Sequence, residues 1–184
     1  QLLVGGLEED GADRPGAGVS ADHRADLALH QLHHLEGLQD PARQAWAYAD
    51  WSRTTFRHGE PARALELANK SLDLAQVSQD GRALVQAHNI LGILERNRGA
   101  LDVAANHLQL SLQLAETSGD LSMQAAALNN LALIQAAQGD PTSAIPLAQQ
   151  ALELCLRQGD RHRAAALHNN LADFLHKLGE EEAA

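Results

Sequence analysis

The sequence contains few aromatic residues, a single cysteine and no long apolar run. Aromatic residues make up only 3% of the 184 residues, so alanine and leucine must supply most of the packing. This palette suits close-packed helices and is poor for strands. The one cysteine, Cys155, excludes a disulfide within the chain and gives no sign of secretion. It falls on the apolar side of a helical pattern, where we expect a buried, inert thiol.

Basic residues are also in the minority. Lysine and arginine number 14 against 24 aspartates and glutamates, which gives a formal net charge of −10. Nonspecific binding to phosphate backbones or anionic lipid needs a basic face, so we expect no nucleic acid or membrane partner. No apolar stretch approaches transmembrane length and no signal peptide is visible, which favours a cytoplasmic domain. Because the chain begins at Gln1 rather than Met, we expect it to be part of a longer protein.

The main feature present is a repeat of 40 residues. Four kinds of column recur at this interval: aspartate, a large apolar residue, a small residue and glycine. They are Asp40, Asp80, Asp120 and Asp160; Trp51, Leu91, Leu131 and Leu171; Ser52, Gly92, Ala132 and Ala172; and Gly59, Gly99, Gly139 and Gly179. Agreement across so many columns indicates an internal repeat.

Each unit predicts two helices. The repeating aspartate is an N-cap, whose carboxylate accepts from free backbone N–H groups. The first helix should end at the glycine column, because glycine adopts the left-handed conformation that stops a helix. In "GEP" (59–61) and "GDP" (139–141) the chain then restarts with an acidic N-cap and a proline at the first helical position. Apolar residues at helical spacing predict a second helix that ends near the next aspartate.

The repeat divides the chain into segments. We expect an irregular segment over 1–21, a lone second helix over 22–38, repeats over 40–79, 80–119 and 120–159, and a partial repeat over 160–184. One hairpin cannot bury its apolar face alone, so neighbours must stack. An array without a polar terminal cap exposes apolar surface, which makes a homodimer through the open C-terminal end one expectation.

The small residues Gly92, Ala132 and Ala172, the leucine before each of these three, and the Ala-x-x-x-Leu of Ala104 and Leu108 resemble the tetratricopeptide repeat. The usual unit of that family has about 34 residues. The longer unit here resembles the version in kinesin light chains, Leu-Gly-Asn-repeat polarity adaptors and sensor regions of bacterial regulators. The resemblance covers 22–184 and implies an all-α fold, a right-handed superhelical solenoid of antiparallel helix pairs. Its first helices would line a concave groove that receives a peptide. The early aromatic column of the family departs from its pattern and holds Tyr48, His88, Leu128 and His168.

Asparagines stand in the middle of the predicted first helices, although asparagine has poor helix propensity. In the long-repeat relatives, asparagines of the first helix commonly hold the main chain of the ligand, so the resemblance implies peptide binding here. An amide offers both a donor and an acceptor, which matches a peptide unit whatever its side chain. The alternative is that the asparagines join one repeat to the next. One column is Asn89, Asn129 and Asn169, and the column beside it is Asn130 and Asn170.

Other candidate peptide contacts share a helix face with the asparagines. The three arginines among them would form a basic end suited to an acidic ligand, and a solvated face with scattered charges is the alternative. They are Asp50, Arg53 and Arg57 in the first repeat, Gln86 and Arg96 in the second, and Asp173, His176 and Lys177 in the partial repeat.

Several patterns resemble catalytic or metal sites without the surroundings that such sites need. "GAGVSA" (16–21) has the spacing of a dinucleotide fingerprint, but no strand precedes it. His88 and His168 occupy the aromatic column, where we expect hydrogen bonds between repeats rather than catalysis. No nucleophile motif is present, so we expect neither an enzyme nor a cofactor. Zinc needs three or four ligands, and we expect no metal at the histidine cluster, which offers His30, His33 and His34 with only Glu36 nearby.

The sequence therefore predicts a protein–protein interaction module that binds a peptide or protein segment in a groove, as part of a larger regulatory or signalling protein. One alternative is a sensor, in which a bound peptide switches an attached effector domain. Another is a structural module for homodimerisation.

Overall fold

The computed structural model describes residues 37 and 40–182, with side chains described as far as Gly179. This part of the chain contains seven helices and no strand. They are α2 (Pro41–Arg57), α3 (Pro61–Ser78), α4 (Gly81–Asn97), α5 (Leu101–Ser118), α6 (Leu121–Ala137), α7 (Pro141–Gln158) and α8 (Arg161–Glu182). The predicted irregular segment over 1–21 and all but Gly37 of the predicted helix over 22–38 lie outside the described residues.

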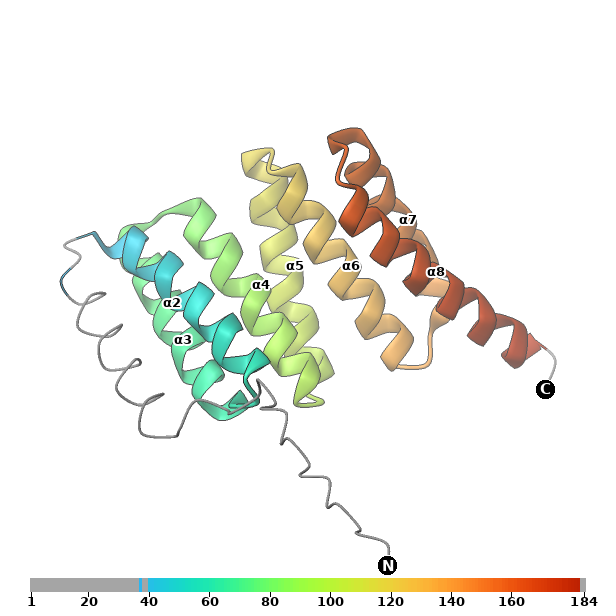
Figure 1. The fold of residues 1–184 in the computed structure, drawn as a ribbon, viewed down its shortest axis with the longest axis horizontal. Helices are drawn as coiled ribbons and strands as arrows, with labels where there is room; N and C mark the ends of the chain where they lie inside the picture. The colour runs from blue at the N-terminus through green and yellow to red at the C-terminus, as the bar shows by residue number, and fades with distance from the viewer. Residues whose placement is uncertain (1–36, 38–39, 183–184) are drawn as a thin grey trace, which may run out of the picture. The chain divides into compact units, whose positions relative to one another are not determined.

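The helices pair as the repeat predicts. α2 packs on α3, α4 on α5 and α6 on α7, and α8 packs on α7. The first helices of successive units also contact one another, so that α2, α4, α6 and α8 form one layer and α3, α5 and α7 form a second (Figure 1). We call these the first-helix layer and the second-helix layer. The predicted all-α fold of stacked helix pairs is confirmed.

The helix ends follow from the repeated aspartates and glycines. Each of the four aspartates accepts a hydrogen bond from a backbone N–H in the first turn of its helix; Ala83 N to Asp80 Oδ1 is 2.7 Å. Glu60 makes no such cap bond, because its longer side chain pairs with Arg63 instead, at 3.7 Å. After α2, α4 and α6 a glycine takes the left-handed conformation, with φ of 81° to 84° at Gly59, Gly99 and Gly139.

The fourth glycine behaves differently from the prediction. Gly179 lies inside α8, which continues to Glu182 rather than ending at the glycine column. Glycine permits the left-handed conformation but does not impose it. A new helix starts two residues after each of the three earlier glycines, at Pro61, Leu101 and Pro141, whereas Gly179 precedes glutamates, which are good helix formers.

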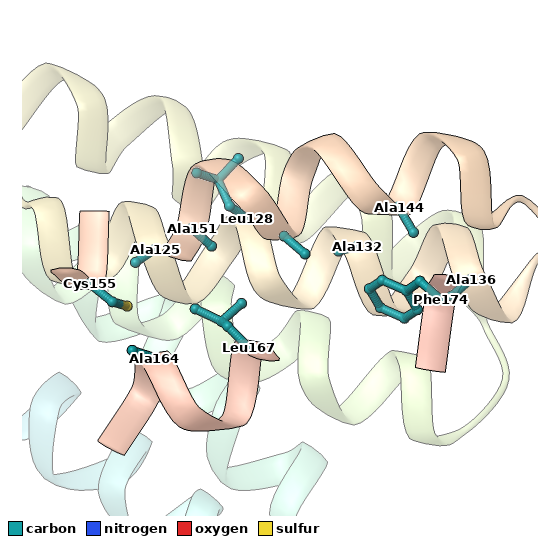
Figure 2. Packing of buried hydrophobic residues seen from close by; sticks show 11 residues of the cluster. Ala125, Leu128, Ala132, Ala136, Ala144, Ala151, Cys155, Ala164, Leu167 and Phe174 are labelled. Carbon is teal, nitrogen blue, oxygen red and sulfur yellow. The ribbon is translucent and has the colours of Figure 1, made fainter. Parts of the chain in front are cut away.

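Small residues let the helices of each hairpin approach closely. Figure 2 shows this core between α6, α7 and α8, where alanines surround Leu128, Leu167 and Phe174. In the second hairpin, a Cβ added to Gly92 would overlap Leu108 Cγ and lie 2.8 Å from its Cδ2. The crossing of α4 and α5 therefore has no room for a side chain at this position.

Candidate functional site

The asparagine columns form two hydrogen-bonded pairs in the first-helix layer. Asn130 Nδ2 on α6 donates to Asn89 Oδ1 on α4 at 3.2 Å. Asn170 Nδ2 on α8 donates to Asn129 Oδ1 on α6 at 2.8 Å. The second asparagine of one repeat thus bonds to the first asparagine of the preceding repeat. These amide pairs link successive first helices.

In each amide pair, one NH2 group and one carbonyl oxygen take no part in the hydrogen bond that joins the two side chains. Within the described part of the chain, the amide group of Asn89 and the carbonyl oxygen of Asn130 make no further hydrogen bond, and both side chains are half-buried. Neither atom is enclosed without a partner. One N–H donor group and one acceptor oxygen therefore stay available at each pair, which is the complement that a peptide unit requires.

The first junction of the array has no amide pair. Ala49 on α2 and Ile90 on α4 stand at the positions equivalent to Asn89 and Asn130. Both are buried, 2% and 5% exposed, in one apolar cluster with Leu91. An apolar contact therefore joins α2 to α4 where amides join the later helices. Packing between neighbours does not require asparagine at these positions.

Asn169 is the one member of the first asparagine column without a partner. It is exposed on α8 and makes no hydrogen bond to the described residues, because no further first helix lies beside it there. Its amide is therefore the most accessible of the five.

Asp50 joins two further candidate residues. Its Oδ1 accepts from Arg53 Nη2 at 2.7 Å and from Gln86 Nε2 at 3.2 Å, which ties α2 to α4. Arg53 is thereby paired with a carboxylate. The predicted basic end then contains two other arginines rather than three equivalent ones.

Arg57 and Arg96 have no carboxylate partner among the described residues. Arg57 is exposed at the end of α2, whereas Arg96 on α4 is half-buried, and burial lowers the pKa of its guanidinium. A partly desolvated cation without a counter-charge gains more from an acidic ligand than a solvated one does. The remaining candidates, Asp173, His176 and Lys177, are exposed along α8.

The histidines of the aromatic column do not bond between repeats as expected. His88 Nδ1 lies 3.0 Å from His107 Nδ1 on α5, the second helix of the same hairpin. His168 is exposed on α8 and has no hydrogen bond to the described residues. The expectation for these two residues was wrong, because α8 carries no covering second helix in this part of the chain and because His88 faces α5.

An apolar pocket of about 660 Å³, which no sequence pattern predicted, lies between α3 and the ends of α2 and α4. In the next junction, Gln138 Nε2 donates weakly to Asp102 Oδ1, at 3.5 Å, across the equivalent place. Ala62 replaces Asp102 at the pocket, a difference that the 40-residue alignment contains. None of the predicted peptide contacts lines this pocket, whose walls are Phe56, Pro61, Ala62, Leu65, Glu66, Asn69, Leu94, Asn97 and Arg98.

The described residues form neither a metal-binding group nor a membrane-spanning helix. Among residues 40–179, no three histidine, cysteine or acidic side chains are grouped so that they could hold a metal ion. The histidine cluster at His30, His33 and His34 and the "GAGVSA" stretch lie outside the described residues. None of α2 to α8 has both the length and the apolar character needed to cross a membrane.

Comparison with known proteins places the helical pairs in a family. The model of the family described as tetratricopeptide repeat matches residues 82–157 and 123–184, together more than half of the chain. No curated protein matches the chain in sequence.

Solved structures share the fold. Aspartyl phosphate phosphatase F from Bacillus subtilis is 16% identical, with a TM-score of 0.71 over 80% of this chain and 39% of its own. BtubC (BKLC) from P. vanneervenii is 26% identical, with a TM-score of 0.60 over 84% of this chain and 61% of its own. A Podosopora anserina protein described as a kinesin light chain with nearly identical TPR-like repeats is 14% identical, with a TM-score of 0.62 over 88% and 80%. This chain therefore spans 39% and 61% of the first two structures.

Proposed function

This chain belongs to the tetratricopeptide repeat family, and we propose that it binds an extended peptide segment along its first-helix layer. Repeats of this fold are generally protein–protein interaction modules. The proposal includes a larger regulatory or signalling protein around this array, as in the bacterial sensor regions that the sequence resembles.

The amide pairs carry the proposal. Each pair offers one donor and one acceptor, and the two pairs recur at the interval of the repeat. A strand-like ligand presents an N–H and a C=O at regular spacing, so the pairs could bind its main chain independently of its sequence. The apolar contact of Ala49 and Ile90 supports this interpretation, because it packs α2 against α4 without any amide. Packing alone therefore does not explain the asparagines of the later junctions.

The charge of the ligand follows from the arginines. Arg96 is partly desolvated without a carboxylate, and Arg57 is unpaired among the described residues. We expect the bound segment to place an acidic side chain toward the ends of α2 and α4, where a charge-assisted hydrogen bond would offset the desolvation of Arg96.

The test uses random peptides displayed on phage and selected on the wild-type protein. The affinity of one selected peptide is then measured by calorimetry for wild type, Asn169→Ala and Asn106→Ala. Asn106 is the matched control, since it is exposed on the second-helix layer and makes no hydrogen bond to the described residues. We expect Asn169→Ala to weaken binding by about 2- to 10-fold, the value of one hydrogen bond, and Asn106→Ala to have no effect. Equal affinities for all three proteins would contradict the proposal.

Homodimerisation is a second candidate, favoured by one face of α8. In each of the three hairpins, two positions of the first helix are buried under the second helix. In the third hairpin these positions are Ala125 and Ala132. The equivalent residues of α8, Ala165 and Ala172, are exposed, and Leu175 is 56% exposed beside them. This apolar face could pack on its counterpart in a second copy of the chain.

Light scattering over a range of protein concentrations tests this candidate. We expect a dimer that Ala172→Glu converts to a monomer, because a charge would be buried in the contact. Ala166→Glu is the control, since Ala166 is exposed on α8 in a column that the second helices leave half-buried. A monomeric wild-type protein at all concentrations would exclude the dimer.

A further inference from the structure

The second hairpin contains a half-buried contact between two histidines. His88 Nδ1 on α4 lies 3.0 Å from His107 Nδ1 on α5, the ring centroids are 5.3 Å apart and the ring planes are tilted by 37°. Both side chains are half-buried. At this distance one Nδ1 must carry a hydrogen and donate it to the lone pair of the other.

The neighbouring hairpins hold, at the same two positions, side chains that do not titrate near neutral pH. Both positions change together in the second hairpin, where two histidines replace an aromatic or aliphatic residue and a leucine. The equivalent pairs are Tyr48 with Leu67 in the first hairpin and Leu128 with Leu147 in the third.

Protonation acts on this contact in two steps. One added proton leaves an N–H on one ring and a lone pair on the other, so the hydrogen bond persists. A second proton leaves two N–H groups and two positive charges facing each other at 3.0 Å, where no hydrogen bond is possible. Two groups this close titrate as a pair rather than singly.

The surroundings offer little to stabilise the doubly charged form. Toward α4, α3 presents Ala64, Ala68 and Leu72, and toward α5, α6 presents Leu131 and Ile134. From α2, Asp50 reaches α4 through its hydrogen bond from Gln86, and its charge is also paired with Arg53.

Glu95 on α4 is the acidic group that acts on the pair. It is 7% exposed, and its Oε2 lies 2.7 Å from Arg98 Nη2 without hydrogen-bond geometry. Burial lowers the pKa of His107, while the charge of Glu95 partly raises it. Burial also lowers the pKa of His88, and the charge of His107 lowers it further.

We propose that the His88–His107 contact is a pH-sensitive latch, which holds α4 against α5 at neutral pH and opens when the second proton binds. Opening would weaken the packing of α4 on α5 in the second hairpin. The hairpins on either side have no histidine pair at the equivalent positions.

The direction of the pH effect follows from the lowered pKa values. Because the folded protein binds these protons less readily than the unfolded chain, the stabilisation is present above the ordinary histidine value, near 6.5. It is lost as the pH falls below that value. Each proton contributes up to about tenfold per pH unit to the unfolding equilibrium.

The test is native-state hydrogen exchange at about pH 7.5 and about pH 5.5, corrected for the intrinsic rates, with a chelator present to exclude metal. The latch variant is His88→Leu/His107→Leu, which copies the third hairpin. His168→Leu is the control, because His168 occupies the same column as His88 and makes no hydrogen bond to the described residues.

In wild type and in the control, we expect the protection of α4 and α5 to fall at the lower pH relative to that of α6 and α7. In the latch variant, this difference should disappear. An equal fall in the latch variant, or no fall in wild type, would overturn the proposal.

A second measurement does not depend on the folding of the variant. The imidazole ¹⁵N resonances of His88 and His107 in the wild-type protein should titrate below the range of the exposed histidines and in two steps. Independent titration of the two rings at ordinary values would also overturn the proposal.

Discussion

Exchanging an amide pair for the apolar contact of the first junction separates packing from recognition. The variant is Asn89→Ala/Asn130→Ile, which places in the second junction the residues that stand at Ala49 and Ile90 in the first. The single change Asn130→Ala removes a donor and leaves Asn89 Oδ1 half-buried, which should cost about 0.5–1.5 kcal/mol.

In the double variant both partners of the hydrogen bond are gone, and the isoleucine adds apolar surface. Ile90 is 5% exposed at the equivalent position, and burying such a side chain contributes about 1.5–3 kcal/mol. This gain offsets the lost hydrogen bond. We therefore expect the free energy of unfolding of the double variant to equal or exceed that of wild type.

Urea denaturation followed by far-UV circular dichroism measures the free energy of unfolding of each variant, because this signal reports all the helices. Tryptophan fluorescence would report α2, which carries both Trp46 and Trp51. A double variant about 2 kcal/mol less stable than wild type would refute the equivalence of the two junctions. A stable double variant that no longer binds the selected peptide would assign the amides to the ligand.

Three further predictions concern the helix crossings, the caps and the thiol. In urea denaturation, Gly92→Ala should lower the free energy of unfolding by about 1–3 kcal/mol, because the added Cβ overlaps Leu108. The double variant Gly92→Ala/Leu108→Ala should lose less stability than the two single variants lose together. Asp120→Ala should cost about 0.5–2 kcal/mol in the same assay, since the bond from Met123 N to Asp120 Oδ1 is lost; no change would show that the cap is dispensable. Cys155 is fully buried and burial raises the pKa of its thiol, so Ellman's reagent should react far more slowly with the native than with the unfolded protein; equal rates would contradict its burial.

The fold was predictable because the repeat multiplies weak local signals. A single aspartate before a helix is a modest indication, but four at one interval, each followed by apolar residues at helical spacing, fix the helix starts. Gly179 shows the limit of this reasoning. It occupies the glycine column, but the residues after it decide whether the helix ends, and these differ from the acid–proline restarts at 60–61 and 140–141.

The contacts of the candidate site were harder to predict than its residues. The 40-residue alignment sets Asn89 beside Asn129, whereas the hydrogen bonds join residues 41 apart, such as Asn89 and Asn130. This offset comes from the way neighbouring first helices pack, which column spacing does not contain. The histidine pair is a different case, because the joint change at His88 and His107 is visible in the alignment once the two columns are compared with each other.

The two irregularities of the second hairpin belong to one region of its core. Gly92 lies one helical turn after His88, and Leu108 follows His107 directly. In the other hairpins, a small residue of the first helix corresponds to an alanine of the second helix. In the second hairpin the two residues are Gly92 and Leu108, and Leu108 occupies the space of the missing Cβ. Because Leu108 follows His107 on α5 and packs on Gly92 of α4, a separation of the two helices at the histidines would also draw Leu108 away from Gly92. Protonation of the histidines would therefore loosen this packing contact as well as the hydrogen bond.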